Sequence, residues 1–393
     1  MIDVSLFFLI IKGLMLILSI SAILFYCYGV YAAIAFSHFS DPINPNFHPP
    51  VTILKPLCGV DTDSYENLVS FIIQDYPQYQ IIFTVRDEKD PIIQIVHKLI
   101  EEYPNKDISL VIKNDIIGAN LKISNLANGY DLAKYDILVI ADSDIRVNSD
   151  YLNSIIPPLQ DENVGVVTCL YRSQATGITA ILEAIGTATD FQPCILVSKQ
   201  LQGVKFAFGS TIVIRKNVLL EIGGLAGISD YLADDYQLGY LPSQLGYKVI
   251  LSNYIVTHNL AKSKFLDSLN RQIRWAKCVR VSRPGGYTGL MFTFGTISSL
   301  ILLIISKFSL WGITLLFITW LCRFFMAWVI GIKVINDEVT KRYFWLIPVW
   351  DVVRFSMWIY SFFGNKITWM GKRFALVKGG KLVMLKEQED KYL

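Results

Sequence analysis

The chain has 393 residues, enough for one large domain or two ordinary ones. It is 53% hydrophobic, with a mean hydropathy of +0.42 that is high for a water-soluble protein of this size. The formal net charge of +3 offers no bulk attraction for nucleic acid, so we expect no nucleic-acid partner. The six cysteines include no CxxC pair, which argues against a zinc site or a disulfide framework and favours a reducing compartment.

The first 36 residues predict a membrane anchor. Residues 13–36 carry no charged side chain, and a helix of this length can cross the hydrocarbon core of a bilayer. A signal peptide is the competing interpretation. The apolar stretch is longer than the core of a typical signal peptide and lacks an obvious cleavage site, so an uncleaved anchor over 1–36 is favoured. Residues 37–50 are rich in proline and predict a linker.

From residue 51, strand-like and helix-like runs alternate. The strand-like runs cover 51–56, 81–87, 108–113 and 136–142. The helix-like runs cover 63–74, 91–103 and 120–134. This succession predicts an α/β fold with a parallel sheet, in which ligands bind beyond the carboxyl ends of the strands. Four aspartates therefore share one edge of the predicted sheet: Asp87, Asp90, Asp142 and Asp144.

Less regular elements complete a water-soluble domain that we expect over 51–285. They are a strand over 164–172, an interfacial amphipathic segment over 177–200, a strand and short helix over 210–225, a helix that opens at Asp234–Asp235, and a basic helix over 262–286.

Apolar segments dominate the remaining chain. Residues 290–306, 310–332 and 343–363 predict a C-terminal membrane region, over 286–365, of two or three helices. The third segment contains Asp351 and Arg354. Their spacing allows a pair on one helix face. Ionisable groups are costly at membrane depth, so we expect the segment to lie at the interface or to pack inward against the other segments. Residues 366–393 predict a basic tail.

The sequence DSD at 142–144 suits a divalent cation. Alternate residues at a strand end point the same way, so Asp142 and Asp144 can share Mg²⁺ or Mn²⁺, which bind few protein ligands. A solvated turn is the alternative, and the tripeptide alone favours it. The aspartates that follow other strand-like runs favour the metal site.

Two other acidic pairs each have two interpretations. Asp235, beside Asp234, is a candidate general base, and the pair is equally typical of a capped helix start. Asp87 and Asp90 can accept hydrogen bonds from a nucleobase or ribose, although Asp90 is also typical of a helix N-cap.

A basic helix face and a glycine complete the candidates. Arg271, Arg274 and Trp275 share one face, where the arginines suit a diphosphate and the indole can line an acceptor pocket. The alternative is a basic helix lying on anionic lipid headgroups. Gly209, before Ser210, allows close backbone approach.

In this order, the motifs resemble those of the ceramide glucosyltransferase family (glycosyltransferase family 21). The similar blocks include "VTILKPLCGVD", "IIFTVRDEKDP", "DILVIADSDIRV", "IRKNVLLEIGGL", "YLADDY" and "RQIRWAK". The resemblance covers roughly residues 51–280, and the flanking apolar segments are similar in layout. It implies a GT-A fold, which is Rossmann-like with a mostly parallel central sheet.

The resemblance also implies roles for individual residues. Asp142 and Asp144 are expected to hold Mg²⁺ or Mn²⁺. Asp235 is expected to be the base, within a signature that includes Asp234. The motif (Q/R)xxRW corresponds to Arg271, Arg274 and Trp275, which we expect to act in catalysis. The residues expected to bind a UDP-sugar donor are Asp87, Asp90, Asn120, Lys122, Asp142, Gly209 and Ser210.

The activity implied is an inverting transfer of a hexose, with glucose expected, from a UDP-sugar to the hydroxyl of a membrane lipid such as ceramide. Two departures bear on the acceptor. Asp144 and Phe206 stand where the animal enzymes have glycine and cysteine. The complete DSD is more similar to bacterial relatives, including enzymes that glycosylate hopanoids. Transfer from UDP-N-acetylglucosamine to a hopanoid or diacylglycerol is therefore the alternative, followed by a processive polysaccharide synthase and a non-catalytic membrane scaffold.

A soluble donor and a lipid acceptor require a site at the bilayer surface. We therefore expect an integral protein of the bacterial inner membrane with its catalytic domain in the cytosol. The N-terminus would then lie outside and the charged loop 333–342 inside.

Overall fold

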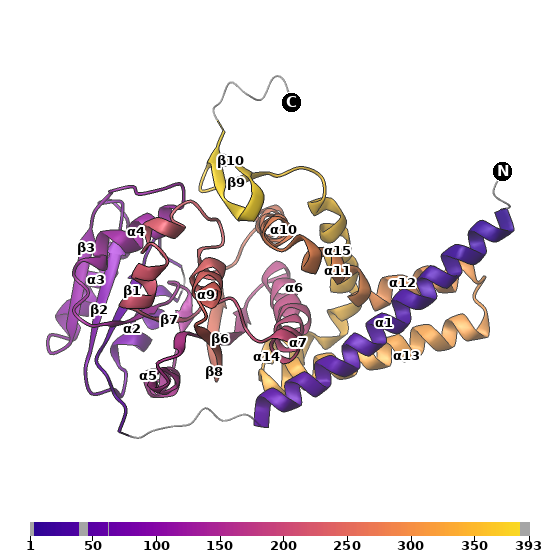
Figure 1. Cartoon of the computed structure of the whole chain (residues 1–393), viewed down its shortest axis with the longest axis horizontal. Helices are drawn as coiled ribbons and strands as arrows, with labels where there is room; N and C mark the ends of the chain where they lie inside the picture. The colour runs from indigo at the N-terminus through magenta and orange to yellow at the C-terminus, as the bar shows by residue number, and fades with distance from the viewer. Residues whose placement is uncertain (1–3, 39–45, 62, 386–393) are drawn as a thin grey trace. The chain divides into compact units, whose positions relative to one another are not determined.

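The computed structural model describes residues 4–38, 46–61 and 63–385, which contacts divide into two compact units. The α/β unit contains the described residues between the linker and residue 174, residues 202–261, and the C-terminal segment from residue 368. A helical unit contains the N-terminal helix, residues 175–201 and residues 262–367. Figure 1 gives the helices and strands of both units.

The α/β unit is built on an eight-stranded sheet of order β3-β2-β1-β4-β7-β6-β8-β5. The strands are β1 (Val51–Pro56), β2 (Tyr79–Val85), β3 (Asp107–Ile112), β4 (Ile137–Ile140), β5 (Ile145–Arg146), β6 (Val164–Ala175), β7 (Ile212–Arg215) and β8 (Lys248–Leu260). Strands β3, β2, β1 and β4 are parallel, as predicted. Strand β7 is antiparallel to β4 and to β6, and β5 is antiparallel to β8. The α/β fold class is confirmed.

Helices cover the parallel half of the sheet, which explains its apolar strands. Strands β1 and β4 are buried along their whole length, as expected where both faces are covered. Helix α3 buries Ile92, Val96 and Leu99, which recur at helical spacing. The helices of this unit are α2 (Ser64–Ile72), α3 (Ile92–Glu102), α4 (Leu121–Tyr130), α5 (Tyr151–Ile155), α8 (Lys216–Glu221) and α9 (Asp234–Gln244).

The segment expected to be a basic tail forms a second sheet, as far as the structure describes it. Its strands, in the order β11-β10-β9, are β9 (Lys366–Trp369), β10 (Lys372–Leu376) and β11 (Leu382–Met384). The segment also pairs with the loop before α9. Leu232 N donates to Gly380 O at 3.1 Å, and Leu382 N donates to Asp230 O at 2.7 Å. These bonds bring the C-terminal sheet to the edge of the larger sheet where the predicted site residues lie.

The helical unit contains three helices long and apolar enough to cross a membrane among the described residues: Leu6–His38, Ile178–Gln202 and Leu310–Val334. The first and last agree with the predicted anchor and the segment 310–332. The middle one, α6 (Ile178–Gly186), η2 (Thr187–Phe191) and α7 (Gln192–Gln202), covers the segment expected at the interface. Helix α1 (Val4–His38) packs against α12 (Gly295–Ile305) and α13 (Leu310–Ala327) (Figure 1).

The other two predicted spans are shorter than expected. Helix α12 has 11 residues and, with the preceding segment Pro284–Thr293, forms a pair bent by 51° that could make a fourth, broken span. Helix α15 (Ile347–Ser361) has only 15 residues. The remaining helices are α10 (Phe265–Ser282), α11 (Pro284–Gly289), η4 (Leu290–Thr293), η5 (Trp328–Val334), α14 (Glu338–Tyr343) and η6 (Phe344–Leu346).

Asp351 and Arg354 pair with residues of other helices and not with each other, so the segment packs inward, which is one of its two expected arrangements. Asp351 Oδ1 lies 2.8 Å from Arg323 Nη2, and Arg354 Nη1 lies 3.2 Å from Asp190 Oδ1. Arg323 Nη2 also lies 3.0 Å from Asp190 Oδ1, so one buried network joins η2, α13 and α15. Partners from other helices surround each charge more completely than a neighbour on the same helix can.

Candidate active site

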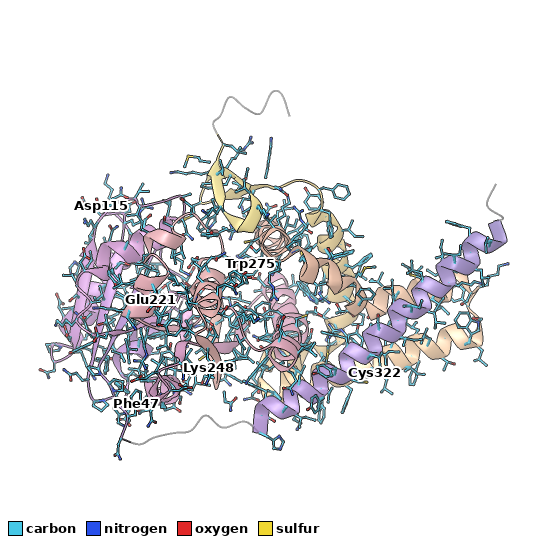
Figure 2. All side chains as sticks on the ribbon, viewed as in Figure 1. Phe47, Asp115, Glu221, Lys248, Trp275 and Cys322 are labelled. Carbon is cyan, nitrogen blue, oxygen red and sulfur yellow. The ribbon has the colours of Figure 1, made fainter. Side chains whose placement is uncertain are left out.

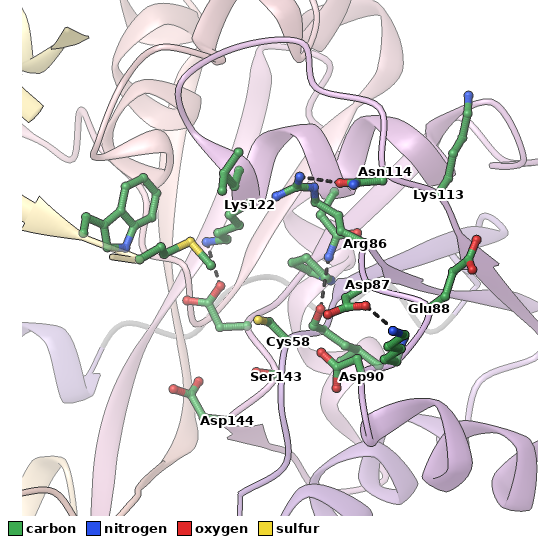
Figure 3. A pocket seen from close by; sticks show the side chains of 18 residues that line it. Cys58, Arg86, Asp87, Glu88, Asp90, Lys113, Asn114, Lys122, Ser143 and Asp144 are labelled. Carbon is green, nitrogen blue, oxygen red and sulfur yellow. Dashed lines mark hydrogen bonds and ion pairs between the residues drawn. The ribbon is translucent and has the colours of Figure 1, made fainter. Parts of the chain in front are cut away.

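A cavity of about 790 Å³ lies beyond the carboxyl ends of β1, β2, β3 and β4 (Figure 3). Its lining comes from the segments after these strands, from the first turns of α4 and from the C-terminal sheet. The lining residues are Pro56, Leu57, Cys58, Arg86, Asp87, Glu88, Lys89, Asp90, Lys113, Asn114, Leu121, Lys122, Asn125, Asp142, Ser143, Asp144, Trp369 and Met370. The predicted edge of the sheet therefore does hold a pocket, with all four of its aspartates in the wall.

Lys122 joins two of the predicted acidic groups. Its Nζ lies 2.6 Å from Asp142 Oδ1 and 3.1 Å from Asp234 Oδ2. Burial alone would lower the pKa of Lys122, but Asp142, Asp234 and Asp235 together raise it well above its ordinary value. Lys122 is therefore a fixed positive charge in the wall of the cavity.

Asn120 is hydrogen-bonded to both Lys122 and Asp234. Its side chain caps α4 by accepting from the backbone N–H groups of Lys122 and Ile123, at 2.9 and 3.3 Å. Its Nδ2 donates to Asp234 Oδ1 at 3.2 Å and to Tyr231 O at 2.8 Å. Asn120 is fully buried, so it positions Lys122 and Asp234 and does not itself line the cavity.

Gly209 connects Asp142 with Asp235. Its N–H donates to Asp235 Oδ2 at 3.1 Å, and its carbonyl accepts from the backbone N–H of Asp142 at 2.9 Å. A Cβ at this position would overlap Asp142 Oδ2, so the close backbone approach expected here is present. Ser210 is buried and donates to Cys169 O at 3.3 Å, which directs its hydroxyl into the sheet.

Asp235 follows Asp234 in the first turn of α9, as the sequence predicts, and its second oxygen accepts from Tyr236 N at 2.8 Å. Burial and the neighbouring charge of Asp234 raise the pKa of Asp235 to about 6, against the opposing effect of Lys122. A carboxylate with this pKa is half protonated near pH 6 and mostly ionised at neutral pH, so it can accept a proton as a general base. Asp235 is not in the cavity wall itself. Gly209 lies between it and the wall residue Asp142 and is hydrogen-bonded to both.

Asp144 has a partner that sequence reasoning missed. His258 Nε2 lies 3.1 Å from Asp144 Oδ2, because β5 pairs with β8 and aligns Ile145 with His258. Burial opposes ionisation of Asp144, but His258 lowers its pKa below the ordinary value. The two residues are 114 positions apart, and no local spacing in the sequence connects them.

Lys55 is a second residue that the sequence reasoning missed. It is fully buried, its Nζ donates to the backbone carbonyl of Asp142 at 2.8 Å, and it lies 3.6 Å from the centre of the Phe71 ring. Burial lowers the pKa of Lys55 to about 7, although Asp144 and Asp142 act in the opposite direction. A lysine inside the apolar strand "VTILKP" was the available signal.

Asp87 and Asp90 line the cavity and also fix their own loop. Asp87 Oδ1 accepts from Lys89 N at 2.9 Å. Asp90 Oδ1 accepts from Ile92 N at 3.0 Å, and its Oδ2 accepts from Gly59 N at 2.8 Å. Asp90 thus accepts from the first N–H of α3, although the N-cap position itself is Pro91, and the carboxylate also ties the loop after β1 to the loop after β2.

The predicted residues Arg271, Arg274 and Trp275 lie on α10, in the helical unit. Figure 2 labels Trp275. Arg271 makes a two-point contact with the buried carboxylate of Glu183 on α6, with Nη2–Oε2 and Nε–Oε1 distances of 2.5 and 3.2 Å. Burial and the charge of Arg271 lower the pKa of Arg274. Trp275 is exposed. Their expected part in catalysis stays a prediction.

The family model and the curated relatives that match this sequence point to the same family. The sequence model described as "Glycosyl transferase family 21" matches residues 14–382. Ceramide glucosyltransferase 1 of Caenorhabditis elegans is 30% identical over 231 residues, which are 58% of this chain and 49% of the relative. The ceramide glucosyltransferase of Komagataella phaffii is 40% identical over 114 residues, 28% of this chain and 22% of that protein. The chain thus spans about half the length, or less, of these relatives.

The fold is also found among solved structures. A mannosyltransferase from Pyrobaculum calidifontis, solved in complex with GDP-Man and Mn²⁺, superimposes with a TM-score of 0.57 at 17% identity. The match covers 90% of this chain and 96% of the mannosyltransferase. The expected GT-A-like architecture is therefore confirmed at the level of the fold.

Proposed function

The chain belongs to glycosyl transferase family 21, and from that premise we propose that it transfers a hexose from a UDP-sugar to the hydroxyl of a membrane lipid, with inversion. The observation that carries this proposal is the connection of Asp142 to Asp235 through Gly209. It puts a carboxylate with a pKa of about 6 one residue behind a charged cavity. A group that takes a proton thus lies next to groups that suit a diphosphate.

The donor set fits a divalent cation. Asp142 and Asp144 both line the cavity. Lys122 contacts one oxygen of Asp142, and His258 contacts one oxygen of Asp144. In the described part of the chain, no group of three or more His, Cys, Asp or Glu is placed to hold a metal ion. Two carboxylates suit Mg²⁺ or Mn²⁺, whose other ligands are waters and substrate phosphates. Such an ion would neutralise charge on the diphosphate as it leaves.

The protein's own residues perform the other parts of the proposed reaction. Lys122 supplies a positive charge to the donor diphosphate from the cavity wall. The lipid hydroxyl oxygen attacks the anomeric carbon from the face opposite the diphosphate, and the bond between that carbon and the phosphate oxygen breaks. UDP leaves with the electron pair, and Asp235 takes the hydroxyl proton. Asp234 raises the proton affinity of Asp235, and Asn120 holds Asp234 in place.

The membrane location follows from the substrates and the helices. We propose that the apolar helices anchor the protein in the bacterial inner membrane, with the α/β unit in the cytosol where UDP-sugars are available. The C-terminal segment belongs to the α/β unit, so its basic residues would lie on the cytosolic side, in agreement with the charge rule.

The substitution Asp235→Asn tests the assignment of the base. We expect the variant to lose turnover by about 10²–10⁴-fold while its affinity for the UDP-sugar stays within threefold, because the amide keeps the shape but takes no proton. The assay measures transfer from UDP-glucose to ceramide in mixed micelles, with donor binding followed by calorimetry. Near-full activity of the variant would show that another group is the base.

The acceptor and sugar are tested with a panel. Purified protein is offered UDP-glucose or UDP-N-acetylglucosamine with ceramide, a hopanoid or diacylglycerol, and the products are identified by mass spectrometry. We expect a single hexose on ceramide. A hopanoid or diacylglycerol product would establish the alternative acceptor, and a polymer would establish the processive synthase.

A further inference from the structure

The C-terminal sheet contributes two large side chains to the cavity described above. Trp369 ends β9 and Met370 follows it, and both line the cavity that Lys122 and Asp142 also line. Both residues belong to the segment 366–393, which was expected to be a basic tail without a functional role. Their presence in the wall makes the end of the chain part of the pocket.

The backbone at this point is unusual. Met370 and Gly371 have φ angles of +49° and +74°, so both central residues of the tight β9–β10 turn are left-handed. Asparagine or glycine is the common choice at the first position of such a turn, and a left-handed methionine is uncommon. Non-glycine residues held in this region are enriched at functional sites, and the side chain of Met370 lies in the cavity wall.

The sheet is also bonded to the loop that positions the proposed base. Its hydrogen bonds with Leu232 and Asp230 fix residues 380–382 beside this loop. The backbone carbonyl of Tyr231, which lies between these two residues, accepts from Asn120 Nδ2, and Nδ2 also donates to Asp234. The sheet is therefore attached to the same framework that holds Lys122 and the two carboxylates.

We propose that Trp369 and Met370 form an apolar wall of the donor pocket and contact a ring of the bound nucleotide sugar, either the base or the hexose. The inference rests on the proposed function, because it needs a nucleotide-sugar donor. Much of the surrounding wall is charged, with Arg86, Asp87, Glu88, Lys89, Asp90 and Lys113, whereas rings present flat apolar faces. An indole can stack on such a face, and stacking of one base on one aromatic ring is worth a roughly 5- to 140-fold change in affinity.

Binding to the full-length protein in detergent, with Mn²⁺ present, tests the proposal. Variants Trp369→Ala, Trp369→Phe and Met370→Ala are titrated with UDP and with UDP-glucose. We expect Trp369→Ala to weaken binding of UDP-glucose by about tenfold and Met370→Ala by severalfold, while Trp369→Phe retains most of the affinity. Loss for both ligands assigns the wall to the base or nucleoside, and loss for UDP-glucose alone assigns it to the hexose.

Met384 provides a matched control in the same sheet. It is 54% exposed, close to the 50% of Met370, but it does not line the cavity. Met384→Ala should bind both ligands like the wild type, and equal weakening by Met384→Ala would overturn the proposal by showing a general effect on the sheet. Wild-type affinity in Trp369→Ala and Met370→Ala would also overturn it while the proposed function stands. If the wild type binds no nucleotide sugar at all, the proposed function fails together with this inference.

Discussion

Gly209→Ala is a sharp test of the proposed site, because the backbone tolerates the change while the site does not. The φ angle of Gly209 is outside the left-handed region, so alanine needs no strained backbone. The new Cβ would overlap Asp142 Oδ2 and lie 3.2 Å from Asp142 Cγ and 3.3 Å from Lys122 Nζ. Relief of that overlap requires the Asp142 carboxylate to rotate away from Lys122.

The expected size of the effect follows from what that rotation removes. The variant keeps both backbone hydrogen bonds of residue 209, so the fold should change little, with a free energy of unfolding within about 1 kcal/mol of the wild type. The donor diphosphate loses a correctly placed carboxylate and its cation. Loss of one preorganised electrostatic contact lowers turnover by about 10²–10³-fold, or roughly 3–4 kcal/mol of the activation barrier.

The measurement is transfer of radiolabelled UDP-glucose to ceramide at several Mn²⁺ concentrations, together with thermal unfolding. Gly289→Ala is the control, because Gly289 has a helical φ of −59° and no atom within 4 Å of the new Cβ. If Gly209→Ala retains transfer within twofold of Gly289→Ala, Asp142 does not hold the reacting diphosphate, and the argument from this contact is refuted.

Further predictions concern protonation and buried partners. Below about pH 6, kcat/KM should fall about tenfold per pH unit, because Asp235 acts as a base only when deprotonated. The variant Asp234→Asn should move this inflection to lower pH, because the charge of Asp234 raises the pKa of Asp235. A flat profile down to pH 5 would exclude Asp235 as the base. His258→Phe removes the partner of Asp144 and should raise the Mn²⁺ concentration for half-maximal activity about tenfold, measured by titration after chelation; an unchanged value would show that the pair does not orient the metal site. Lys55→Met should lower kcat/KM about tenfold without a lower melting temperature, since methionine fills the buried site but cannot donate to Asp142 O; activity equal to the wild type would mean that this bond does not support the site. Arg323→Leu should destabilise the protein by about 3–5 kcal/mol, measured by unfolding in mixed micelles, because buried carboxylates lose their partner; a loss below about 1 kcal/mol would mean that other groups compensate.

The parallel half of the fold was predictable because its signals are local. The apolar strand β4 ends at Ile140, and the acidic pair follows at the expected edge. Helix α9 begins at Asp234, as its acidic opening predicts. Each of these features depends on neighbours within about ten residues, which sequence pattern captures well.

The rest of the site depends on contacts between distant segments. His258 reaches Asp144 only because β5 pairs with β8, and Lys55 reaches Asp142 only because β1 pairs with β4. The C-terminal strands gave no strong pattern, since basic residues and glycines interrupt them and only a few side chains are buried. Composition alone therefore suggested a tail where the chain builds a wall of the cavity.

The charge network of the helical unit has a consequence for how the protein is made. Asp190 lies in the middle of the apolar segment Ile178–Gln202, and Arg323, its partner, is synthesised 133 residues later. When the segment Ile178–Gln202 leaves the ribosome, Asp190 has no cation from α13 or α15 to neutralise it. We expect this segment to wait at the water-lipid boundary until Arg323 emerges. Asp190→Asn should therefore speed its membrane integration in a translation-arrest assay, and equal timing would contradict a charge-controlled order of insertion.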